Sequence, residues 1–128
     1  MSGLSDYAEN KLLDHLLGTA AYTAPTTVYI GLATASFADD NSGAELTGNN
    51  YARKAITFGS ASSGATDNTS AVEFNAATGS WGSISHFGIF DASVGNNLLI
   101  HGEFTTPKTI ASGDVLKIDA GDLDITAD

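Results

Sequence analysis

The chain has 128 residues, no cysteine and a formal net charge of -10, with fifteen acidic residues against five basic ones. Its length suits one domain with a single core, and its acidity argues against nucleic acid or an anionic membrane as a direct partner, since both would repel it. Disulfides and thiolate metal sites are excluded, and no segment approaches the roughly 20 apolar residues of a membrane span.

One helix is predicted, over Leu4–Leu17, because leucine and alanine recur there on one broad stripe opposite acidic and amide side chains. Ser2 or Ser5 suits its N-cap, and Gly18 suits its end. A helix this short is marginal in water by itself, so its leucine stripe needs either the sheet or another subunit as a partner. Residues 1–18 form the first unit of the predicted organisation.

The second unit, residues 26–128, contains about seven short strands separated by turn-rich segments. In the strand expected at 51–58, the core face should be Ala52, Ile56 and Phe58. Two polar segments, 36–50 and 59–70, are expected to be exposed loops. The expected strands are Thr26–Ala33, Tyr51–Phe58, Ala71–Ala76, Ile84–Asp91, Leu98–Phe104, Val115–Ile118 and Leu123–Ile125.

The centre of the fold is expected to be the hairpin of Ile84–Asp91 and Leu98–Phe104. Its first arm carries apolar residues on both faces, which is typical of an internal strand covered on both sides. We expect Phe87 and Ile89 to be covered by the N-terminal helix or by a neighbouring subunit. The fold class predicted is all-β, a β-sandwich of jelly-roll-like type with one short N-terminal α-helix.

Three histidines invite a metal-binding interpretation. His86 and His101 lie on adjacent arms of the hairpin and could share a metal in one register, although a third ligand would have to come from elsewhere. Two structural histidines are the simpler interpretation. His15 on the helix is expected to be a surface or contact residue.

Two groups of oxygen-bearing side chains resemble calcium ligands, but neither follows EF-hand spacing. They are Asp39, Asp40, Asn41 and Glu45 in the long loop, and Asp119, Asp122, Asp124 and Asp128 near the C-terminus. The second group reads first as the solvent face of a strand. No nucleophile elbow and no phosphate-binding loop occurs in the sequence. We therefore predict no catalytic, cofactor-binding or metal site, and no enzymatic activity.

The order of segments along nearly the whole chain resembles a family of small virion proteins of tailed bacteriophages. The most specific pieces are Tyr51-Ala52-Arg53, Trp81-Gly82, His86-Phe87-Gly88-Ile89-Phe90-Asp91 and Gly121-Asp122-Leu123. Members of this family are often labelled tail fibre proteins, and similar small β-sandwich proteins decorate capsids as trimers. The resemblance implies a structural protein of the virion.

Among virion roles, we expect a capsid decoration (cement) protein on the outer capsid surface, forming a homotrimer and binding the major capsid protein. A fibre needs a shaft, and this chain has neither heptads nor repeats. The alternative is a tail fibre, receptor-binding or other tail-associated protein. A third possibility is a glycan-binding module in which Trp81 with Tyr51 or Tyr29 forms a stacking platform.

Overall fold

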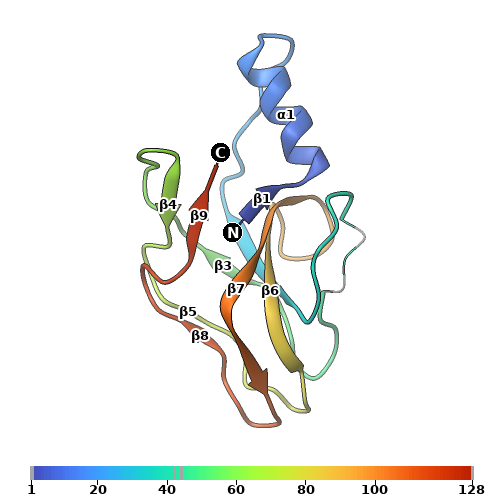
Figure 1. Cartoon of the computed structure of the whole chain (residues 1–128). Coiled ribbons are helices and arrows are strands. Elements are labelled where there is room, and N and C mark those ends of the chain that lie inside the picture. Colours follow the sequence, from blue (N-terminus) through green and yellow to red (C-terminus); the bar gives the residue numbers. More distant parts are fainter. Residues whose placement is uncertain (1, 42, 44, 128) are drawn as a thin grey trace.

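The structure, a computed structural model, describes residues 2–41, 43 and 45–127, which form one helix and nine strands among these residues (Figure 1). The helix is α1 (Asp6–Leu16). The strands are β1 (Ser2–Leu4), β2 (Val28–Ala33), β3 (Lys54–Ile56), β4 (Ala65–Asp67), β5 (Val72–Glu73), β6 (Gly82–Phe90), β7 (Leu98–Ile110), β8 (Lys117–Ile118) and β9 (Asp124–Thr126).

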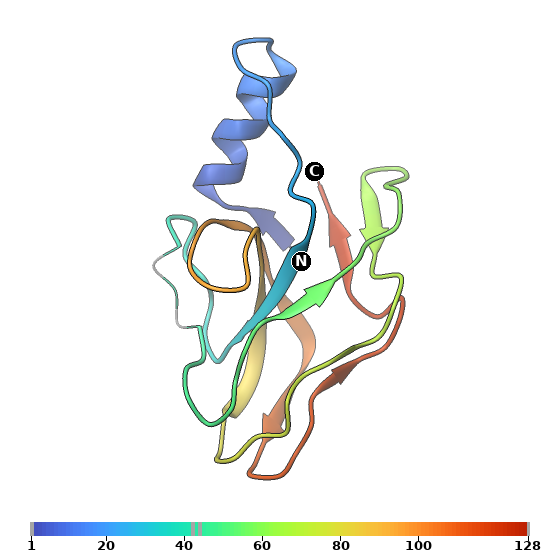
Figure 2. The same cartoon turned by 180° about the vertical axis from the view of Figure 1, so that it is seen from behind.

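The main sheet has five antiparallel strands in the order β1-β7-β6-β2-β3, so the predicted hairpin of β6 and β7 does lie at its centre. Two further ribbons, β4–β9 and β5–β8, are each two-stranded. Figures 1 and 2 show these ribbons following one another along the same side of the body. The prediction of an all-β fold with one N-terminal helix is confirmed.

The hydrophobic core joins the main sheet to both ribbons. A single cluster of buried side chains combines Phe87 and Ile89 of β6 with residues of the ribbon region such as Val72, Phe74 and Leu116. The ribbons and their flanking segments, and not the helix, therefore cover this face of β6, which corrects the expected cover of Phe87 and Ile89.

The opposite face of the main sheet carries a smaller buried cluster. Its members are Ala33, Phe90 and Leu98 from the sheet, and Phe37 from the loop that follows β2. Phe37 meets Phe90 edge to face, with ring centroids 5.8 Å apart. β6 is thus covered on both faces, as its apolar pattern predicts.

The N-terminal segment differs from its prediction at the start of the helix. Residues Ser2–Leu4 form β1, paired with β7, and the helix begins only at Asp6. Ser5 is the N-cap: its Oγ accepts from Ala8 N and donates to the carbonyl of Leu98. Gly18 follows the C-cap with a positive φ of 79°, a conformation that favours glycine. Among the described residues, no helix is long and apolar enough to cross a membrane.

Several strand boundaries also differ from the sequence pattern. β3 covers only part of the expected strand at 51–58, and Ala52 is exposed although it was expected in the core. The segment 59–70, expected to be an exposed loop, contains β4 and the buried Asn68. Asn68 forms a β-bridge with Phe58, and its side chain donates to the carbonyls of Ser70 and Asp119 and accepts from Leu123 N.

Strand β7 is longer than expected and continues through Pro107 to Ile110. A register shift between Ile84 and His86 places the residues around Pro107 opposite an irregular part of the β6 ladder. Proline lacks a backbone donor and is tolerated at such irregularities and at sheet edges. The regular pairing is therefore interrupted at the proline and resumes at Lys108, so the strand continues.

Candidate functional site

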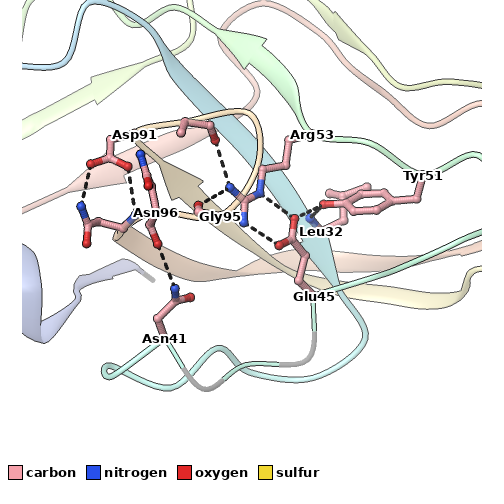
Figure 3. Close-up of polar contacts among 10 residues, drawn as sticks. Leu32, Asn41, Glu45, Tyr51, Arg53, Asp91, Gly95 and Asn96 are labelled. Carbon is pink, nitrogen blue, oxygen red and sulfur yellow. Dashed lines mark hydrogen bonds and ion pairs between the residues drawn. The ribbon is translucent and has the colours of Figure 1, made fainter.

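The most elaborate polar arrangement lies at the outer face of the main sheet, where the chain's only arginine, Arg53, meets Glu45 (Figure 3). Arg53 Nε donates to Glu45 Oε2 and Nη2 donates to Oε1, both at 2.8 Å. The arginine side chain is only 9% exposed and that of Glu45 is 23% exposed. A two-bond pair of this kind fixes the orientation of both planar groups.

Tyr51 completes this arrangement from the same segment of chain. Its hydroxyl donates to Glu45 Oε2 at 2.6 Å and accepts from the backbone N–H of Leu32 in β2 at 2.9 Å. Burial raises the pKa of the Tyr51 phenol above its ordinary value of 10.0, and the hydrogen bond to Glu45 adds to this rise. Through these two hydrogen bonds, Tyr51 connects Glu45, in the long loop after β2, to the backbone of β2 itself.

Arg53 also holds the loop that joins β6 to β7. Its Nη1 donates to the carbonyls of Ala92 at 3.0 Å and Gly95 at 2.9 Å. Across the same loop, Asp91 accepts hydrogen bonds from the backbone and side-chain amides of Asn97. The hydrogen bonds from Arg53 hold this loop in place at the surface. Within the loop, Val94 is 83% exposed.

Both oxygens of the Glu45 carboxylate already accept hydrogen bonds from Arg53 or Tyr51, so the carboxylate serves the packing of the loop. Sequence reasoning placed Glu45 among possible calcium ligands and missed its pairing with Arg53. The signal that could have found it was the presence of one arginine in a strongly acidic chain, within the Tyr51-Ala52-Arg53 motif.

The other members of the first candidate calcium group are separated as well. Asp39 Oδ1 lies 2.6 Å from His101 Nε2, and Asn41 Nδ2 donates to the carbonyl of Asn96 at 3.4 Å. Asp40 follows Asp39 on the exposed loop. The structure therefore uses this group to attach the loop to β7 and to the β6–β7 loop.

The C-terminal acidic group is spread over different elements. Asp119 lies 3.7 Å from Lys117 Nζ, Asp122 donates its backbone N–H to the Asp119 carbonyl, and Asp124 begins β9. Asp128 lies outside the described residues. Among the residues that the structure describes, no three acids, histidines or cysteines are grouped to hold a metal ion.

The histidines of the hairpin each face a separate carboxylate. His86 Nε2 lies 3.4 Å from Glu103 Oε2, while His101 is paired with Asp39. The register matches His86 with Glu103 and Gly88 with His101, so the two rings are not directly opposite. His15 accepts the backbone N–H of Tyr22 through Nδ1, at the exposed end of the helix.

Trp81 is part of the core and not of a surface platform. It is 5% exposed, its Nε1 donates to the Asn49 carbonyl at 2.9 Å, and its ring meets Tyr51 at a centroid distance of 5.7 Å. Trp81 therefore cannot form the stacking platform of the third possibility, the glycan-binding module.

The helix α1 carries apolar side chains that are exposed to solvent. None of its residues is buried. Figure 1 shows the helix projecting beyond the end of the body. Its leucine face, defined as Leu12, Leu13, Leu16 and the C-cap Leu17, is 42%, 55%, 67% and 74% exposed along the chain. Exposed leucines gathered on one surface are typical of a protein contact.

Comparison with known proteins places nearly the whole chain in one family. The profile of a family described as podophage GP4 fiber I protein gp80 matches residues 3–126. The chain belongs to this family. A search of curated proteins returns no match. As a member of the gp80 fibre family, the chain is a structural protein of a phage virion, related to fibre proteins, which confirms the resemblance drawn from the sequence motifs.

Proposed function

We propose that this protein is a compact module of a phage fibre, acting through protein contacts at its surface and not through chemistry. What carries the proposal is the match of residues 3–126 to a fibre family together with a helix whose leucines remain exposed. A projecting helix with an exposed leucine face, on an otherwise well-packed body, suits a part that must be joined to others.

The polar arrangement around Arg53 supports a structural and non-enzymatic role. The side chains that would have to act on a substrate are already engaged, because Glu45 accepts from Arg53 and from Tyr51, and the Tyr51 hydroxyl accepts from Leu32 N–H. Their arrangement stabilises the β6–β7 loop, which presents Val94. In a fibre, such a loop supplies a fixed contact surface.

Capsid decoration is the second candidate, with the major capsid protein as partner and the outer capsid surface as location. The observation that favours it is the shape of the chain: residues 26–127 form a body of sheet and ribbons, apart from the two gaps at 42 and 44, and the sequence has no heptads or repeats for a shaft. This second role would require many copies spread over the shell.

Cryo-electron microscopy of virions labelled with a gold-conjugated antibody against this protein distinguishes the two candidates. We expect label confined to fibres, and a low copy number by quantitative mass spectrometry of purified virions. Label distributed over the head, with a high copy number, would replace the fibre proposal by capsid decoration. Virions from a phage that lacks the gene, treated with the same antibody, serve as the control for antibody specificity.

A further inference from the structure

A second apolar feature, the β7–β8 groove, lies between the main sheet and the β5–β8 ribbon. Its lining includes Ile84, Phe104, Thr106, Lys108, Leu116 and Ile118. Among the described residues, β1 pairs with β7 only at Ile100–Gly102, and β8 pairs only with β5. The register shift opposite Pro107 and the two unpaired edges leave this opening between the layers.

The charge at the β7–β8 groove is unusual for this chain. Of the five basic residues, Arg53 is paired with Glu45, Lys54 donates to Asn75, and Lys11 belongs to α1. The remaining two, Lys108 and Lys117, both line the groove, as does Asp122. Lys117 also lies 3.7 Å from the exposed Asp119. Two of the chain's five basic side chains thus lie beside the apolar opening, where Asp119 and Asp122 offset part of their charge.

The leucine face of α1 has the complementary character. Its apolar side chains are accompanied along the helix by Asp6, Glu9 and Asp14. At about 100° of rotation per residue, Glu9 falls on the same side of the helix as Leu13 and Leu16, which corrects its expected place opposite the leucine stripe, and Lys11 falls on the opposite side. The helix therefore offers leucines next to carboxylates, and the groove offers apolar side chains next to lysines.

We propose that α1 of one copy inserts its leucine face into the β7–β8 groove of a second copy. This deepens the proposed function by naming the partner within the fibre. The helix projects from one end of the body and β8 lies away from that end, so the contact joins different surfaces of two molecules (Figure 1). A contact between unlike surfaces repeats into a ring if the rotation closes, and into a filament if it does not. The homotrimer expected from the sequence is the closed ring of three.

The contact is tested on purified protein by sedimentation velocity over a wide concentration range. Wild type is expected to form oligomers. Leu16→Asp removes an exposed leucine from the helix, and Thr106→Trp fills the groove from an exposed position on β7. Each variant alone should be monomeric. Mixed together, they should form a dimer of about twice the 13.1 kDa chain mass, because one intact helix then meets one intact groove.

Matched controls are Lys11→Asp, which changes an exposed residue on the opposite side of α1, and Thr105→Trp, one position away from Thr106 and outside the groove lining. Both should assemble as wild type does. A monomeric wild type at millimolar concentration overturns the contact. A wild type that assembles while the mixture of the two variants stays monomeric overturns it also, because like surfaces would then be joined. Neither result affects the placement of the protein in the virion, which is determined on virions.

Discussion

Gly31 and Gly88 are register partners on the adjacent strands β2 and β6, and the ring of Phe90 lies over both. A methyl group at Gly31 would come within 2.9 Å of Phe90 Cε1, and one at Gly88 within 3.0 Å of the same atom. The Arg53 guanidinium in turn lies 3.5 Å from the centre of that ring. Two missing side chains thus make the space in which the arginine is held.

Gly31→Ala is expected to lower the free energy of unfolding by about 1–3 kcal/mol, because the added methyl would also lie 2.7 Å from Glu45 Oε2. Urea denaturation followed by far-UV circular dichroism measures the change. Gly3→Ala is the matched control, since a methyl group on that strand glycine meets nothing within 4 Å. Equal stability of the two variants would contradict the crowding at Gly31.

Arg53→Ala is expected to lower the free energy of unfolding by roughly 3 kcal/mol, since it leaves a largely buried Glu45 without its cation. Arg53→Lys should recover only part of this loss, because an ammonium cannot reproduce the two parallel bonds to Glu45. A double-mutant cycle with Glu45→Ala measures the coupling. If the two single changes are additive, the pair contributes nothing specific.

Tyr51 should make the protein sensitive to alkali. Its pKa is raised in the folded state, so its contribution to stability is complete below the unfolded value near 10.0 and is lost as pH rises above it toward the folded value. The loss of stability between pH 9 and pH 11, measured by urea denaturation, should be smaller in Tyr51→Phe than in wild type. Tyr29→Phe corrects for removal of one phenol; the same pH slope in both variants would rule out this role of Tyr51.

Asn68→Ala is expected to cost roughly 3 kcal/mol of stability, because it leaves the Ser70 and Asp119 carbonyls and the Leu123 N–H without their partner. Asn75→Ala, at a less buried position, should cost less. Thermal unfolding by calorimetry compares the two. A melting temperature for Asn68→Ala equal to that of wild type would show that these backbone groups find other partners.

Metal removal should have no effect on folding. Both hairpin histidines face a carboxylate, since His86 meets Glu103 and His101 meets Asp39, and Glu45 is paired with Arg53. We expect dialysis against a chelator to leave the melting temperature unchanged. A rise of several degrees on adding calcium or zinc would instead show a site that folding alone does not assemble.

The sequence predicted what depends on local alternation. The β6–β7 hairpin, the approximate helix and the strand at 28–33 follow from apolar periodicity, which reports burial directly. Boundaries failed where tertiary pairing decided the outcome. Ser2–Leu4 lengthen the apparent helix in sequence, yet they pair with Ile100–Gly102 of β7. Asn68 has the character of a turn residue in the sequence. It is buried because its side chain bonds backbone groups of Asp119 and Leu123, which are distant along the chain.

The candidate site was less accessible to sequence reasoning. Glu45 and Arg53 are close along the chain, but their pairing depends on the glycines at positions 31 and 88, which lie on two other strands. Nothing local indicates that a carboxylate in a polar loop will face an arginine rather than a cation from solution. The exposure of the leucine face also depends on tertiary structure, because both faces of the main sheet pack against other segments and not against α1.

The helix α1 is inserted between β1 and β2, and both of these strands belong to the main sheet. Ser5 N–H and Oγ bond the carbonyls of Leu99 and Leu98, so the base of the helix is fastened to β7 as well. A mechanical load on the free end of α1 is consequently divided among strands of the main sheet. Under traction the short β1 ladder is the element that should yield first, and it can yield while the core stays closed.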